Sequence, residues 1–251
     1  MKKQTVPLIR LNKFLAIHGV GSRRYCESLI QEGKVLVNGE AACLGMKIDP
    51  RHDQIFLADQ GKITPKNSKL HYIMLYKPTG YLTTMADPLE RQTIRELIPE
   101  IPDRIYPIGR LDYQSEGLIL LTSDGNLAYR ISHPSSGVPK TYLVKVKGHP
   151  SPQLRNRLVQ GIKLKDGWSS LDEIREMKSR TLANTWFRLV IHSGKNHIIR
   201  RMFMAIGHPV VKLKRISIAG VGIGQLKPGQ WRFLTTQEIQ LLKEFGNKKE
   251  K

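Results

Sequence analysis

A polar segment at residues 58–69 divides this chain of 251 residues. Its sequence, ADQGKITPKNSK, contains Gly, Pro, Asn and Ser without a sustained apolar period, which is typical of a connection between domains. A chain of this length suits one large domain or two modest ones. We therefore expect a small domain over residues 1–57, a linker over 58–69, a larger domain over 70–246 and a basic tail at 247–251.

Residues 1–57 combine the signals of two short helices and a hairpin. Apolar residues recur at helical spacing over residues 11–18, and Ser22 is placed to cap a second helix that ends near Gly33. The dipeptide Asn38-Gly39, between apolar runs, is the strongest two-residue signal for a β-hairpin. The first domain is therefore expected to be a small α/β unit.

Beyond residue 69, strand and helix signals mix. We expect strands at 72–76, 117–122, 141–146 and 186–192, and helices at 126–132, 152–160, 196–206 and 236–245. The strands do not alternate strictly with helices of crossover length, which argues against a doubly wound parallel sheet. The predicted fold class is α+β, with the small α/β domain followed by a domain that has a mixed, largely antiparallel sheet.

The charge balance indicates a polyanionic partner. The chain has 41 Lys and Arg against 21 Asp and Glu, a formal net charge of +20. Residues 177–237 contain no Asp or Glu but eleven Lys or Arg, which suits a surface that contacts phosphates; a solvated basic face is the alternative. In the second predicted helix, Arg23 and Arg24 are expected to face outward. Nucleic acid is the leading partner class, ahead of an anionic membrane surface.

Several classes of protein and site are not expected. No stretch approaches the roughly 18 apolar residues of a membrane span, and Met1–Arg10 lack the pattern of a secretory signal. Cys26 and Cys43 are too isolated for a metal motif, and Cys26 is expected to pack in a core. There is no phosphate-binding loop and no dinucleotide fingerprint. We expect a cytoplasmic monomer that uses neither cofactor nor metal.

One unusual passage, GRLDYQSEG at residues 109–117, precedes an apolar run. Loops on a rigid scaffold often carry reactive groups, so Asp112, close to Arg110 and between two glycines, is a candidate nucleophile or base. From spacing alone, a simple turn or capping role is at least as good an interpretation. Asp124 is expected to cap the helix that follows it.

A second cluster, GKNHIIRRMF at residues 194–203, contains adjacent arginines. If a helix begins at Asn196, Arg200 and Arg201 leave it in different directions, so that one can enter a cleft while the other meets RNA. Solvated phosphate contacts are the alternative. Tyr142 begins a predicted strand, where it is either a packing residue or a platform for an extruded base.

These passages together resemble a known family. The motifs KPTG (77–80), GRLDYQSEGLILLTSDG (109–125), HPS (133–135), KTY (140–142) and IIRRMF (198–203) resemble, in this order, the pseudouridine synthases that modify bacterial ribosomal RNA. Residues 1–57 resemble the alpha-L RNA-binding motif that precedes the catalytic domain in that family. The resemblance covers nearly the whole chain.

The resemblance implies an activity and a set of site residues. Such enzymes break the glycosidic bond of a uridine, turn the uracil in the pocket and rejoin it through a carbon, with neither cofactor nor metal. By resemblance, Asp112 is the essential carboxylate, Arg200 holds it ionised through a charge-assisted bond, and Tyr142 stacks on the flipped uracil. Whether the carboxylate attacks the sugar, attacks the base or removes a sugar proton stays open. Contacts to the RNA are expected from Arg110, Lys140, Lys195, Arg201, Arg23 and Arg24.

Two positions depart from the family pattern. Ile198 stands where the family usually has Gln, and Ser193 where it usually has an acidic residue; we expect them to tune the surroundings of Arg200 or the RNA contact. The linker and the segments 144–148 and 206–215 look closer to the members that act on large-subunit (23S) RNA. The alternatives are a small-subunit (16S) enzyme and, from another class, a non-catalytic RNA-binding assembly factor. The expected partner is ribosomal RNA or a ribosomal subunit precursor.

Overall fold

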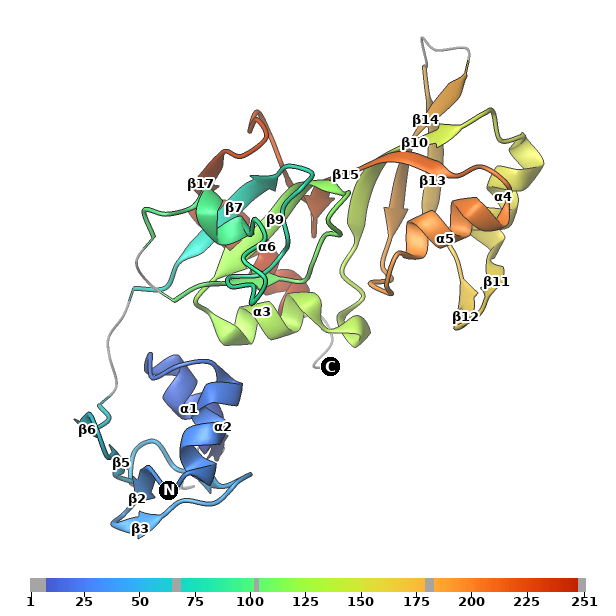
Figure 1. Ribbon diagram of the computed structural model, residues 1–251. Coiled ribbons are helices and arrows are strands. Elements are labelled where there is room, and N and C mark those ends of the chain that lie inside the picture. The colour runs from blue at the N-terminus through green and yellow to red at the C-terminus, as the bar shows by residue number, and fades with distance from the viewer. Residues whose placement is uncertain (1–7, 65–68, 102–103, 179–182, 248–251) are drawn as a thin grey trace. The chain divides into compact units, whose positions relative to one another are not determined.

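The computed structural model describes residues 8–64, 69–101, 104–178 and 183–247. The chain divides into two compact units, residues 1–69 and 70–251 (Figure 1). Each unit has a hydrophobic core of its own. The predicted tail beyond residue 247 and the middle of the predicted linker, 65–68, lie outside the described residues.

The first unit packs two helices against short strands. Its elements are β1 (Ile9–Arg10), α1 (Leu11–Ile17), α2 (Arg23–Gln31), β2 (Val35–Val37), β3 (Glu40–Ala41), β4 (Lys47–Ile48), β5 (Ile55–Leu57) and β6 (Gly61–Lys62). Ser22 Oγ accepts a hydrogen bond from the Tyr25 amide at 3.0 Å, which confirms the predicted cap. The hairpin between β2 and β3 is also confirmed, with Asn38 at φ +54°. Cys26 lies in the core, and β6 occupies residues that we predicted to be linker.

The second unit is built on one sheet, which has nine strands within the described residues. The order is β13-β14-β10-β15-β9-β7-β17, with β8 paired to β9 and β16 to β15. Of these strand pairs, only β15 and β9 run parallel, so the predicted α+β fold with a mixed, largely antiparallel sheet is confirmed. The strands are β7 (Tyr72–Lys77), β8 (Tyr106–Ile108), β9 (Glu116–Thr122), β10 (Lys140–Lys147), β13 (Glu173–Met177), β14 (Asn184–Ile191), β15 (Val210–Ile218), β16 (Val221–Gly222) and β17 (Trp231–Phe233).

The remaining elements of this unit are helices and one separate hairpin. They are η1 (Ile94–Leu97), α3 (Gly125–Ser132), η2 (Pro134–Ser136), α4 (Pro152–Gln160), β11 (Ile162–Leu164), β12 (Gly167–Ser169), α5 (Ile198–Ala205) and α6 (Thr236–Asn247). Asp124 caps α3 as predicted, because its carboxylate accepts from the amides of Asn126 and Leu127 at 3.0 Å. The helix α5 begins at Ile198, two residues later than predicted, since His197 has a left-handed backbone with φ +50°.

The parallel pair β9–β15 joins two cores of the second unit. One core lies among β10, β14 and α5, and another among β7, β9, α3 and α6 (Figure 1). At the junction, a Cβ atom on Gly117 would lie 2.2 Å from the Arg215 carbonyl oxygen, so only glycine allows the two strands to approach. The loop that carries Asp112 leads into β9 at this junction, and the residue before α5, His197, lies next to Asp112.

Candidate active site

A cavity of about 260 Å³ lies where the loop before β9 meets the start of α5. The loop contributes Arg110 and Asp112 to its wall, and β10 contributes Lys140 and Tyr142. Residues 192–199 and Arg215 of β15 also line the cavity. The fold therefore brings together residues that are about 100 positions apart in the sequence.

The Asp112 carboxylate has two side-chain partners among the described residues. Its Oδ1 lies 3.3 Å from His197 Nε2, and its Oδ2 accepts a hydrogen bond from Ser115 Oγ at 3.5 Å. The side chain of Asp112 remains 34% exposed, so it can still reach a bound molecule. Our sequence analysis did not single out His197; the only local signal was a histidine just before the apolar periodicity of α5.

The buried Lys77 fixes the backbone of this loop. Its ammonium donates hydrogen bonds to the carbonyl oxygens of Pro78 at 3.0 Å, Asp112 at 3.1 Å and Ser115 at 2.8 Å. Burial lowers the pKa of Lys77 to about 8, while the nearby Asp112 carboxylate opposes that shift. Lys77 therefore holds the loop in one conformation, a role that the KPTG motif alone did not reveal.

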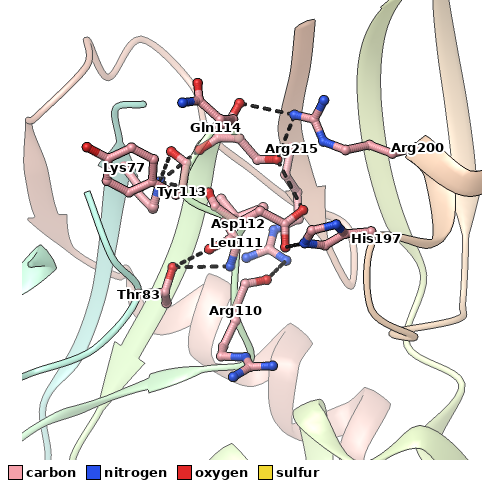
Figure 2. A network of polar contacts seen from close by, with 11 residues as sticks. Lys77, Thr83, Arg110, Leu111, Asp112, Tyr113, Gln114, His197, Arg200 and Arg215 are labelled. Atoms are coloured by element: carbon pink, nitrogen blue, oxygen red, sulfur yellow. Dashed lines mark hydrogen bonds and ion pairs between the residues drawn. The ribbon is translucent and has the colours of Figure 1, made fainter. Parts of the chain in front are cut away.

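Arg200 reaches the carboxylate through an intermediate residue. We expected a direct bond to Asp112, but Nη2 of Arg200 donates to the Gln114 carbonyl at 3.1 Å (Figure 2). The same Nη2 donates to Ser115 Oγ at 3.3 Å. Because α5 starts at Ile198, the guanidinium extends along the backbone of the loop, and its Nη1 also contacts the Val210 carbonyl at 3.5 Å. The buried Ser115 hydroxyl connects the guanidinium to Asp112.

Arg215 and Lys140 are two of the four cations that line the cavity among the described residues. Arg215, which is almost fully buried, donates from Nε to the Leu118 carbonyl at 2.8 Å and from Nη1 to the Arg110 carbonyl at 3.4 Å. Lys140 donates to the His192 carbonyl at 3.2 Å; burial, and secondly the charge of Arg215, lower its pKa to about 8. Cations therefore outnumber carboxylates on this wall, which favours a ligand with negative charge.

Of the other predicted contact residues, some line the cavity and some do not. Arg110 is exposed at its edge, and Lys195 lines it while donating to the Asp166 carbonyl at 3.1 Å. Arg201 instead forms a bidentate ion pair with Asp166 at 2.7 and 3.0 Å, so its guanidinium holds a hairpin in place rather than standing free for RNA. Arg23 and Arg24 are exposed in the first turn of α2, in the first unit.

Residues 177–237, which contain no Asp or Glu, are less uniformly positive in the folded protein than their sequence indicates. Acidic residues from outside it pair with Arg188 (Glu173, 3.7 Å), Arg201 (Asp166) and Arg232 (Glu238, 2.6 Å), and Arg215 is buried. Arg180 lies outside the described residues. The predicted phosphate-contacting surface is therefore partly neutralised. Of the two departures from the family pattern, Ile198 packs into the core, and Ser193 Oγ accepts from the Lys195 amide at 3.3 Å.

Within the described residues, no cluster of His, Cys, Asp and Glu is arranged to hold a metal ion. The helices that can be described there are all too short or too polar to cross a membrane.

Comparison with known proteins identifies the family to which this chain is related. Residues 71–205 match the family model described as RNA pseudouridylate synthase, and residues 9–55 match that of the S4 domain. The chain is 45% identical to an uncharacterized RNA pseudouridine synthase of Aquifex aeolicus, over 96% of each chain. It is 40% identical to ribosomal large subunit pseudouridine synthase B of Bacillus subtilis, over 95% of this chain and 97% of that protein.

A solved structure supports the same assignment. A crystal structure of a pseudouridylate synthase superposes with a TM-score of 0.65 and 30% identity, covering 93% of this chain and 99% of that one. The matched segment contains the loop of Asp112, the strand of Tyr142 and the start of α5. The chain therefore belongs to the RNA pseudouridylate synthase family, with an S4 domain preceding the synthase domain.

Proposed function

We propose that this synthase isomerises one uridine of large-subunit ribosomal RNA, acting as a cytoplasmic monomer on the RNA or a subunit precursor. The observation that carries the proposal is the Asp112 carboxylate, which contacts His197 and Ser115 on the wall of a cavity that Tyr142 also lines, while Lys77 holds the Asp112 backbone carbonyl. The choice of the large subunit rests on the similarity to synthase B of Bacillus subtilis.

The chemistry is an internal rearrangement. The bond between N1 of uracil and C1′ of ribose breaks, the uracil turns in the cavity, and a bond from C5 to C1′ forms while C5 loses a proton and N1 gains one. Asp112 acts as the essential carboxylate, and each of its three possible roles requires that it be ionised. We assign Arg200 the role of orienting that carboxylate through Ser115, and Tyr142 the role of stacking on the uracil.

The reacting bond cannot be reached inside a stacked helix. The uridine must leave the stack at a cost of a few kcal/mol, and contacts elsewhere on the RNA must offset this cost. The S4 domain with its exposed Arg23 and Arg24 supplies one such contact surface, and Arg110, Lys140 and Lys195 supply others beside the cavity. RNA binding would thus involve both units, while the chemistry lies on the second.

Purified protein incubated with separate large- and small-subunit RNA transcripts tests the proposal. We expect pseudouridine in the large-subunit transcript with the wild-type protein and none with Asp112→Asn, which removes the charge but keeps the shape. Pseudouridine in the small-subunit transcript alone would reassign the substrate. RNA binding by the wild-type protein without any pseudouridine would instead support a non-catalytic assembly factor.

A further inference from the structure

A second cavity, of about 290 Å³, adjoins the first. His192, Ser193 and Lys195 line both cavities, so one short segment between β14 and α5 separates them. The other lining residues are Gln160, Gly161, Trp168, Ser169, Ser170 and Asp172. The two cavities are similar in volume, and under the proposed function the first must hold a uracil.

The hairpin β11–β12, which forms one side of the second cavity, is clamped to α5. Asp166, in the turn of the hairpin, accepts two hydrogen bonds from the guanidinium of Arg201, and its carbonyl accepts a third from Lys195. Lys195 belongs to the segment that the two cavities share. The hairpin therefore has a fixed position beside the candidate active site.

Trp168 follows this turn in β12 and is 70% exposed. Its indole lies close to Gly161, because a Cβ atom on that glycine would be in van der Waals contact with Cε3 of the ring at 3.5 Å. Part of the ring is thus in contact with the hairpin's surroundings at Gly161, while most of the side chain stays open to solvent. An exposed tryptophan on a rigid hairpin contributes little to the core, but it is suited to stack on a flat ligand.

Polar groups surround the open part of this cavity. The carboxylate of Asp172 pairs with Nδ1 of His192 at 2.7 Å, and Gln160 also lines the wall. These groups offer both donors and acceptors to the edge of a nucleobase, and Lys195 places a positive charge between the two cavities. Stacking and a nearby cation are the two features that proteins combine to hold single-stranded nucleic acid.

We propose that this second cavity, with Trp168 as its stacking platform, holds the nucleobase next to the target uridine on the same RNA strand. The inference rests on the proposed function, because the first cavity then holds the extruded uracil. A neighbouring base held by Trp168 stabilises the unstacked conformation of the strand. The subsite affects substrate binding and leaves the bond rearrangement to the first cavity.

Steady-state kinetics on the RNA that the wild-type protein modifies test this subsite. Trp168→Ala should raise KM on the order of tenfold, the loss expected for one stacked base, with kcat changed by less than about twofold. Trp168→Phe, which keeps an aromatic face, should recover most of the affinity. Leu89→Ala is the matched control, because it removes an equally exposed apolar side chain (72%) from the segment before η1.

Failure of the subsite can be distinguished from failure of the proposed function. An unchanged KM in Trp168→Ala, while Asp112→Asn is inactive, would overturn the subsite and keep the enzyme. If no RNA is modified, tryptophan fluorescence tests the subsite instead. A short single-stranded oligouridylate should quench the fluorescence of the wild-type protein more than that of Trp168→Phe. Equal quenching of the two proteins would overturn the subsite in that case as well.

Discussion

His197 takes a left-handed backbone conformation, with φ +50°, and places its imidazole Nε2 3.3 Å from Oδ1 of Asp112. A residue other than glycine in this conformation costs about 1–3 kcal/mol, and such strain tends to persist where the surrounding structure needs the side chain in one place. Here the strained residue begins α5 and positions the imidazole beside the carboxylate. We infer that His197 orients Asp112.

Replacing His197 separates the backbone strain from the imidazole contact. His197→Gly should lower kcat by about 10- to 100-fold, the loss expected for one polar contact to a charged group. The free energy of unfolding should change by less than about 1 kcal/mol, because relief of strain offsets the greater freedom of the unfolded chain. Urea unfolding measures the free energy of unfolding, and activity assays on the same proteins measure kcat. A large loss of stability with unchanged kcat would show that His197 only supports the fold.

The connection from Arg200 through Ser115 to Asp112 predicts coupled effects. Ser115→Ala and Arg200→Ala should each lower kcat, and the double variant should fall about as far as Arg200→Ala alone, because either change breaks the same path. Thr83→Val is the control: Thr83 exchanges hydrogen bonds with the backbone of Leu111 but lies outside this path. Its effect should add to that of Arg200→Ala. If the losses of Ser115→Ala and Arg200→Ala instead add in the double variant, Arg200 acts independently of Ser115.

Lys77 should make stability depend on pH in a particular direction. Its pKa is about 8 in the folded protein against an ordinary 10.5, so between these values the unfolded chain binds more protons than the folded one. The free energy of unfolding contributed by this group therefore rises with pH across that window, with a slope of at most about 1.4 kcal/mol per pH unit.

The comparison of wild type with Lys77→Met isolates this contribution. Urea unfolding from pH 8 to 10.5 should show a steeper upward trend in the wild type than in the variant. The variant should also have a lower kcat, since the carbonyls of Asp112 and Ser115 lose their shared donor. Identical pH dependence in the two proteins would contradict the lowered pKa.

The S4 domain should bind RNA through its exposed arginines. Arg23→Glu combined with Arg24→Glu should weaken RNA binding and reduce the slope of log affinity against log salt by about two, because two phosphate contacts are lost. Lys34→Glu combined with Arg51→Glu makes the same change in charge at cations that already pair with Glu32 and Asp49. This control should have a smaller effect. Equal effects would indicate a general charge effect rather than contacts at α2.

Local signals predicted much of the fold. Ser22, Asp124 and Asn38-Gly39 each act through bonds or turns within a few residues, which a sequence displays directly. The strand β15 was missed because it interleaves Lys and Arg with apolar residues, and its Arg215 is buried through contacts to distant backbone carbonyls. The strand at the centre of the sheet is thus one that hydrophobic periodicity alone does not mark.

The candidate site was predictable in its residue types but not in its connections. The cavity contains Asp112, Tyr142, Arg110, Lys140 and Lys195 of the predicted set. Lys77 and His197 were missed because their contacts with the Asp112 loop span 35 and 85 residues of sequence. The route from Arg200 through Ser115 depends on where α5 begins, and a left-handed residue at position 197 sets that start.

Mapping of pseudouridines in ribosomal RNA tests the central claim most directly. Chemically marked pseudouridines would be sequenced in both subunits from cells with the gene, without it, and with only Asp112→Asn. We expect one site in large-subunit RNA to be modified with the wild-type gene and to be unmodified in the other two strains. A site that persists with Asp112→Asn, or no difference among the three strains, would contradict the assignment of Asp112 and of the reaction.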